Sequence, residues 1–243
     1  MQNYPQKKGI DFILKLAFSY WSRTLLYQVV FSVLFISVMV LVATYFMNEY
    51  GVLEQYAAVY QKFIQNQDMA EYQQNLTALG AKPEFQQLFW ILFGTNVFLY
   101  PLNLGLFKMF RKLDLNEKPE ITDLFAGYTG INFFIYISFY LFWFIIYMYS
   151  APTIILGIIW IFITLFSAPL MFFMDKRIFE TISLSVKGLR LYFIEIVVCI
   201  LVAVLFKYIG IFTLVGALFT FPFVNAMIYA LYQVVFAEKT EKV

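Results

Sequence analysis

The chain contains no histidine and one cysteine, Cys199. The absence of histidine excludes Ser-His-Asp triads, Cys-His nucleophiles and haem held by histidine. A single cysteine forms no disulfide framework within the chain, and without histidine it builds none of the usual Cys/His zinc sites. Cys199 lies inside an apolar run, a position typical of a packed and unreactive thiol. The composition therefore predicts a protein without a cofactor, a metal centre or a nucleophilic catalytic site.

Charged residues are also scarce in this chain. They make up 13% of the 243 residues, about half the share found in an ordinary soluble domain. The net charge of +2 is too small to indicate a nucleic-acid partner. Hydrophobic residues make up 62%, and they gather in long runs that match a hydrocarbon layer about 30 Å thick. The sequence therefore predicts a polytopic membrane protein.

The apolar runs predict six membrane helices in one all-α transmembrane domain covering residues 1–243. They lack the alternation of barrel strands, and a helix satisfies its own backbone hydrogen bonds, as lipid requires. Very short connections follow the third and fifth helices, so we expect the six helices to pair as three hairpins. The expected helices are Leu25–Met47, Phe89–Phe107, Ile131–Tyr149, Thr153–Met174, Leu191–Phe206 and Ile211–Phe236.

The distribution of Lys and Arg predicts the orientation of the chain. Fourteen of the 17 basic residues fall in the N-terminal segment, the second and fourth connections and the C-terminal tail. The other three are Lys62, Lys82 and Lys207. Because cytoplasmic connections carry the excess of basic residues, both termini are expected in the cytoplasm.

The first connection, residues 48–87, is then expected to form an extracytoplasmic helical loop. It is rich in Gln and holds five acidic residues against two basic ones. Val52, Tyr56, Val59 and Phe63 recur at helical spacing. We therefore expect one or two short amphipathic helices lying over the outer face of the membrane.

An imperfect repeat links the three expected hairpins. Each hairpin carries a proline in the cytoplasmic half of its second helix, at Pro101, Pro169 or Pro222. A partly apolar segment precedes each hairpin and is expected to be a cytoplasmic interfacial amphipathic helix. Proline is common in membrane helices, so coincidence is the alternative to a repeat. Proline bends either surround a vestibule open to the cytoplasm or only fit neighbouring helices together.

The third interfacial segment, "IFETISLSVKGLRLYF", places basic residues opposite an aliphatic stripe. This pattern is typical of a helix among lipid headgroups, where each basic residue contributes about 1 kcal/mol near anionic lipid. The alternative is a connector whose stripe packs on its own helices. Lys176 and Glu180 are four residues apart and would support this helix weakly. The basic residues concerned are Lys176, Arg177, Lys187 and Arg190.

Four polar residues form the candidate intramembrane site: Glu195, Asn96, Asn103 and Asn225. An acidic residue within a span, such as Glu195, is a functional candidate by default. A basic neighbour such as Arg190 could instead hold Glu195 in a structural ion pair. Asn96 and Asn103 share one face of the second expected helix, which indicates either helix packing or a path for a polar substrate.

Three segments carry a resemblance to known proteins: "DLFAGY" at 123–128, "SLSVKGLRLYF" at 183–193 and "GALFTFPFVNAMIYALYQVVF" at 216–236. They resemble a broad, poorly characterised group of bacterial six-helix integral membrane proteins, some labelled as the membrane domain of glycerophosphodiester phosphodiesterases. The resemblance covers residues 95–236 and implies a multi-pass protein of the bacterial inner membrane. It carries over no catalytic residue, because a phosphodiesterase needs histidine and acidic metal ligands and this chain has no histidine.

The sequence shows no constellation able to carry out a reaction. We therefore expect a non-enzymatic inner-membrane accessory or scaffold subunit that contacts membrane lipids and binds other integral membrane proteins. Protein insertion or export machinery is one setting for such a subunit. The alternative is a transporter or scramblase of lipids or amphipathic small molecules, which parallel repeats, proline bends and a basic interfacial helix favour.

Overall fold

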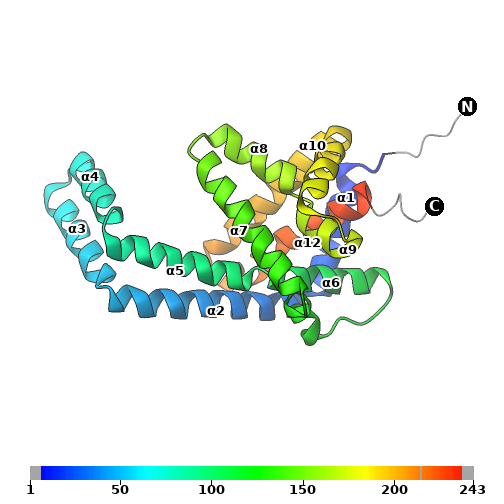
Figure 1. Cartoon of the computed structure of the whole chain (residues 1–243), viewed down its shortest axis with the longest axis horizontal. Coiled ribbons are helices and arrows are strands. Elements are labelled where there is room, and N and C mark those ends of the chain that lie inside the picture. The colour runs from blue at the N-terminus through cyan, green and yellow to red at the C-terminus, as the bar shows by residue number, and fades with distance from the viewer. Residues whose placement is uncertain (1–6, 214, 237–243) are drawn as a thin grey trace, which may run out of the picture. The chain divides into compact units, whose positions relative to one another are not determined.

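The computed structural model describes residues 7–213 and 215–236, and every regular element in these ranges is a helix (Figure 1). Contacts divide the chain into two compact units, which are described separately. Unit 1 consists of the described residues of Met1–Val33 and Tyr100–Val243, and unit 2 is Leu34–Leu99.

Unit 1 holds most of the helices, and helix α2 runs from this unit into unit 2. Unit 2 contains the rest of α2, α3 (Val52–Asn66), α4 (Met69–Gly80) and α5 (Pro83–Leu99). Unit 1 contains α1 (Ile10–Arg23), the first part of α2 (Leu25–Glu49), α6 (Leu102–Asp114), the 3₁₀ helix η1 (Ile121–Tyr128), α7 (Asn132–Ser150), α8 (Ile154–Thr164), α9 (Ser167–Met174), α10 (Ile178–Ile211), α11 (Val215–Thr220) and α12 (Phe223–Val235).

Six helical stretches within the described ranges are long and apolar enough to cross a membrane. Their number agrees with the six membrane helices predicted from the apolar runs. The stretches are Leu25–Glu49, Pro83–Asp114, Phe133–Ser150, Ile154–Met174, Ile178–Ile211 and Val215–Val235. The structure therefore fits a multi-pass membrane protein built only from helices.

The three prolines of the predicted repeat lie at breaks in these stretches. Pro101 lies between α5 and α6, and Pro222 lies between α11 and α12. Pro169 lies in the first turn of α9, just after the break that separates α9 from α8. A proline has no backbone N–H and crowds the preceding turn, but it is well tolerated where a helix starts. Each proline therefore belongs to the beginning of a new half-helix.

Side chains donate hydrogen bonds to backbone carbonyl groups beside these breaks. Asn103 Nδ2 donates to the carbonyl of Tyr100 (2.8 Å), and Trp21 Nε1 donates to that of Phe219 (2.8 Å). Thr164 Oγ1 donates to the carbonyl of Trp160 (2.6 Å), and Thr220 Oγ1 donates to that of Gly216 (3.1 Å). The asparagine and the two threonines act within their own broken span, whereas Trp21 reaches across from α1.

The core of unit 1 forms around the half-helices that follow the prolines. Helix α12 packs on α1, α6 and α10, and α6 also packs on α9. Tyr229 of α12 is fully buried. Its ring centre lies 5.5 Å from that of Phe110 in α6, 5.7 Å from Phe173 in α9 and 5.1 Å from Tyr20 in α1. Aromatic rings thus fill the space between these helices, which favours close fitting over a vestibule.

The third interfacial segment and the fifth span together form α10, which runs from Ile178 to Ile211. The sequence predicts a span beginning at Leu191, and two helices meet at a kink at the next residue, Tyr192 (φ −127°, ψ 35°). The segment contains no proline that would end a helix. Gly188 faces α12, where an added Cβ would lie 2.9 Å from a methyl group of Val235. The part of α10 before the kink therefore packs closely on α12.

Unit 2 contains a pair of short helices, α3 and α4, which lie side by side (Figure 1). They lie within residues 48–87, where the sequence predicts one or two short helices. The ring centres of Phe63 and Tyr72 lie 4.6 Å apart across the pair. Asp68 caps α4 by accepting hydrogen bonds from the backbone N–H groups of Ala70 and Glu71. The stripe predicted from Val52 to Phe63 thus packs, at least in part, against α4.

Two glycines allow η1 to dock closely on α6. A Cβ added to Gly105 would lie 2.2 Å from the backbone oxygen of Leu124. A Cβ added to Gly127 would lie 2.5 Å from the backbone oxygen of Pro101. Both neighbours are backbone atoms, which cannot move aside as a flexible side chain can. The two glycines are therefore needed for this contact.

We expect Gly105→Ala to destabilise unit 1 by about 3 kcal/mol, the upper part of the range for overpacking. The added methyl group would collide with the Leu124 backbone and displace η1. Thermal unfolding in detergent micelles measures the loss. Gly94→Ala is the matched control, because no atom lies within 4 Å of its added Cβ. An unfolding temperature for Gly105→Ala equal to that of Gly94→Ala would contradict the close docking.

Candidate functional site

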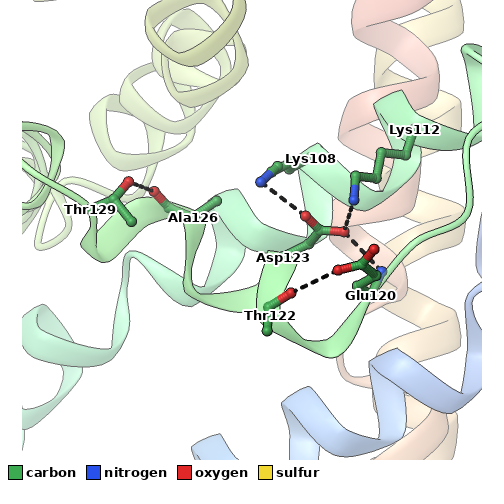
Figure 2. A network of polar contacts seen from close by, with 7 residues as sticks. All are labelled: Lys108, Lys112, Glu120, Thr122, Asp123, Ala126 and Thr129. Carbon is green, nitrogen blue, oxygen red and sulfur yellow. Dashed lines mark hydrogen bonds and ion pairs between the residues drawn. The ribbon is translucent and has the colours of Figure 1, made fainter.

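Two lysines of α6 hold the carboxylate of Asp123 in η1 (Figure 2). Lys108 Nζ lies 2.9 Å from Oδ1, and Lys112 Nζ lies 2.7 Å from Oδ2. The lysines are four residues apart and therefore lie on one face of the helix. Figure 2 shows both side chains pointing toward the carboxylate. Asp123 is buried, with 3% of its surface exposed, so this double ion pair anchors η1 to α6.

Asp123 also caps η1. Its Oδ2 accepts a hydrogen bond of 2.9 Å from the backbone N–H of Glu120, whose own carboxylate accepts one from Thr122. Burial alone would raise the pKa of Asp123, but hydrogen bonds from Lys112, Lys108 and the Glu120 backbone outweigh it. The pKa of Asp123 is therefore held below its ordinary value of 3.8. The group stays ionised at neutral pH, which is unsuitable for a proton carrier.

A second carboxylate, Asp114 at the end of α6, joins three helices. Its Oδ1 accepts a hydrogen bond of 2.6 Å from the hydroxyl of Tyr20 in α1. Its Oδ2 accepts bonds from the hydroxyl of Tyr229 (2.6 Å) and from Gln233 Nε2 (2.7 Å), both in α12. Burial, followed by the bond to Asp114, raises the pKa of Tyr20 well above its ordinary value. The phenol therefore keeps its proton and acts as a permanent donor.

The structure brings two of the four predicted intramembrane residues together. Asn225 Nδ2 donates a hydrogen bond of 3.0 Å to Asn103 Oδ1, which joins the first turn of α12 to the first turn of α6. Both side chains are half-buried. An amide bond between helices fixes their packing in a membrane. Asn96 lies on α5, in unit 2, and is not part of this pair.

Glu195, the acidic residue expected in a span, pairs with Lys7. Lys7 Nζ lies 2.8 Å from Glu195 Oε1 and 4.8 Å from the ring centre of Tyr192, where α10 is interrupted. Glu195 Oε2 is buried and has no hydrogen-bond partner within the part of the chain that the structure describes. The sequence pointed to Arg190, one turn away, as a basic neighbour. The partner instead comes from the N-terminal segment and fastens that segment to α10.

The basic residues of the third interfacial segment occupy two places. Lys187 and Arg190 lie on α10 and are exposed. Lys176 and Arg177 precede the helix, and Arg177 is its N-cap residue. The expected pairing of Lys176 with Glu180 along a helix is wrong, because α10 begins two residues after Lys176. Glu180 instead accepts a hydrogen bond of 3.3 Å from the backbone N–H of Arg177.

Several residues of these networks escaped the sequence analysis. Lys108 and Lys112 served only to predict orientation, although their spacing and the following acidic segment were a signal for an ion pair. The sequence did not predict the hydrogen bonds of Asp114, because its partners Tyr20 and Tyr229 lie 94 and 115 residues away. Such distant partners leave no local pattern in a sequence.

The arrangement of acidic groups indicates a structural role. Asp114, Asp123 and Glu195 each bind donors that come from a different segment of the chain. Within the described ranges, no three His, Cys, Asp or Glu side chains are placed to hold a metal ion. These carboxylates thus join helices to one another.

We expect Asp123→Asn to lower the stability of the fold by about 1.5–3 kcal/mol at neutral pH, the range for a hydrogen bond to a charged group. Because the pKa of Asp123 is lowered by folding, its contribution is present above the ordinary value near 3.8 and is lost as the pH falls through the folded value. Thermal unfolding of both proteins from pH 7 toward pH 3 tests this. A difference that stays constant at acidic pH would contradict the ion pair.

We expect Lys7→Ala to destabilise the fold more than Glu195→Gln does, because Lys7→Ala leaves a carboxylate unpaired within a span. Glu195→Gln removes the charge itself. The double variant should therefore unfold near the temperature of the single Glu195→Gln variant, as thermal unfolding in micelles would measure. Additive effects of the two substitutions would show that Lys7 and Glu195 act independently.

Comparison of the chain with protein-family models, with curated proteins and with solved structures found no match.

Proposed function

We propose that this protein is a non-enzymatic accessory or scaffold subunit of the bacterial inner membrane, a member of the six-helix group that it resembles, and that it binds other integral membrane proteins. The observation that carries the proposal is that its carboxylates are used to join its own helices. Asp123 holds η1 on α6, Asp114 joins α1, α6 and α12, and Glu195 holds the N-terminal segment on α10. Membrane-protein insertion or export machinery remains one setting for such a subunit.

The packed core supports an architectural role. A carrier needs polar groups that bind a substrate and a space to hold it. Here Tyr229, Phe110 and Phe173 occupy the region where α12, α6 and α9 meet. The neighbouring Asp114 is engaged by two tyrosines and a glutamine. Both features stabilise one arrangement of the helices.

The apolar surface of the spans supplies the area for partner helices and lipid. Helix α8 illustrates this, since five of its first six residues are exposed aliphatic side chains. They point in several directions around the helix because successive residues are turned by about 100°. One side can therefore contact lipid while another contacts a partner. The five residues are Ile154, Ile155, Leu156, Ile158 and Ile159.

The orientation and the repeat belong to this proposal. We place both termini in the cytoplasm and pair the spans as three hairpins. We place α1, η1 and the first half of α10 at the cytoplasmic interface, one before each hairpin. The exposed side chains of Arg177, Lys187 and Arg190 support that place for α10. Lys239 and Lys242, which also entered the prediction of orientation, lie outside the described residues.

One observation favours the second candidate, a transporter or scramblase of lipids or amphipathic molecules. Broken membrane helices line the substrate sites of many transporters. In this chain the half-buried pair of Asn103 and Asn225 joins the first turns of two half-helices. The pair would then contact a polar part of the substrate.

We expect the tagged protein to co-purify with other integral membrane proteins in fixed ratio after mild detergent extraction from its native membrane. Mass spectrometry of the native complexes measures this. A tagged, unrelated six-helix protein from the same membrane is the control for carry-over.

The same purified protein separates the two candidates. Reconstituted alone in vesicles, it should not accelerate the movement of fluorescent phospholipids between leaflets. Two results together would overturn the accessory role and support the transporter or scramblase. The protein would be recovered without partners, and in vesicles it would move lipid between leaflets unless Asn103 is replaced by alanine.

A further inference from the structure

Helix α3 carries a second apolar stripe that α4 does not cover. The first stripe includes Val52, which is buried, and Phe63, which stacks on Tyr72 of α4. The second stripe consists of Leu53, Tyr60 and Ile64, which are 47%, 48% and 56% exposed. Their spacing of seven and four residues places them on one face of the helix. Unit 2 thus presents an exposed apolar face along α3, and contact with water at this face is unfavourable.

The connections of unit 2 keep this face close to the membrane boundary. Only Tyr50 and Gly51 separate α3 from the end of α2, and only Ala81 and Lys82 separate α4 from α5. Both α2 and α5 belong to candidate membrane spans. Two linking residues make three Cα–Cα steps, which span at most about 11 Å. The first residue of α3 and the last residue of α4 therefore stay within that distance of the ends of α2 and α5.

The chain turns sharply at the link between α2 and α3. Gly51 adopts a left-handed conformation (φ +59°), which glycine takes at little cost. The chain can therefore leave the span and turn at once into α3. A second left-handed residue, Gln67, turns the chain from α3 into α4.

The chemistry of the stripe matches the boundary between lipid headgroups and acyl chains. Tyrosine is enriched at this boundary, because its ring is apolar and its hydroxyl is polar. Leu53 and Ile64 supply aliphatic area on either side of Tyr60 along the helix. The opposite side of α3 presents exposed Ala58, Lys62 and Gln65. A helix with one apolar and one polar side is suited to lie in the plane of the interface.

The length of the stripe decides how the helix would lie. It extends from the first turn of α3 to the last, and a helix of 15 residues is about 22 Å long. All three side chains reach lipid only if the helix lies along the membrane surface. Residues 48–87 hold five acidic residues against two basic ones, so attraction to anionic headgroups does not account for the contact. The apolar area itself would supply the binding free energy.

We propose that α3 lies in the headgroup–acyl boundary of the same bilayer that α2 and α5 span, with Leu53, Tyr60 and Ile64 in lipid. The α3–α4 pair is then an amphipathic anchor that fixes the ends of the two spans. This inference does not depend on the accessory role, because lipid alone is the occupant of the surface.

Site-directed spin labelling of the full chain in vesicles tests the proposal. Cys199 is fully buried, so labels should react with introduced cysteines, and labelled wild type gives the background. The stripe is probed with Leu53→Cys, Tyr60→Cys and Ile64→Cys. Ala58→Cys, Lys62→Cys and Gln65→Cys are matched controls, because these positions are exposed on the same helix. Vesicles of phosphatidylethanolamine with a minor share of phosphatidylglycerol supply the bilayer.

We expect labels on the stripe to collide with oxygen, which concentrates in lipid, several-fold more often than with a water-soluble nickel chelate. The control positions should show the reverse order. Both patterns should persist when phosphatidylglycerol is replaced by zwitterionic phosphatidylcholine, because charge does not drive the contact.

Two results would overturn the proposal. Labels on the stripe that favour the nickel chelate would place this face in water. Labels shielded from both reagents would show that protein covers the face, either a second copy or another part of the chain. Thermal unfolding of each labelled variant confirms that the fold is intact, and either result in a folded variant counts against lipid contact.

Discussion

Backbone hydrogen bonding at the helix breaks constrains how the rest of the structure packs. In hydrocarbon, an unpaired carbonyl group costs several kcal/mol, so the carbonyl groups beside a break need donors. Beside Pro222, Trp21 of α1 donates to the carbonyl of Phe219, and beside Pro101 the carbonyl of Tyr100 accepts from both the backbone and the side chain of Asn103. Helix α1 is therefore tied to the break beside Pro222.

The breaks also determine where the core forms. Each proline starts a new half-helix, and the half-helices α6, α9 and α12 meet around the ring of Tyr229. The hydroxyl of that ring reaches Asp114, so apolar packing and a polar network share one residue. The Asp123 clamp then fixes η1 against α6. Such an arrangement stabilises a single conformation of the helices.

The fold was more predictable than the site. Six spans could be predicted because burial in lipid demands long apolar runs, and such runs are visible in the sequence. The boundary predicted at Leu191, between a charged amphipathic segment and the fifth span, lies next to Tyr192, where α10 leaves helical geometry. For Glu195 the sequence allowed a structural ion pair but pointed to the nearest basic residue. The actual partner, Lys7, is brought there by the path of the N-terminal segment.

The sequence by itself determined that the chain is helical, that six stretches can cross a membrane and that no histidine chemistry is available. These properties follow from the composition and from the lengths of the apolar runs. Only the tertiary structure decided which polar groups meet, such as Asn103 with Asn225 and Tyr20 with Asp114, separated by 122 and 94 residues. It also decided which face of α3 is covered by α4 and which, with Tyr60, is left exposed. The physical reason is that hydropathy and helical period are encoded locally, whereas contacts between helices depend on how all of them pack.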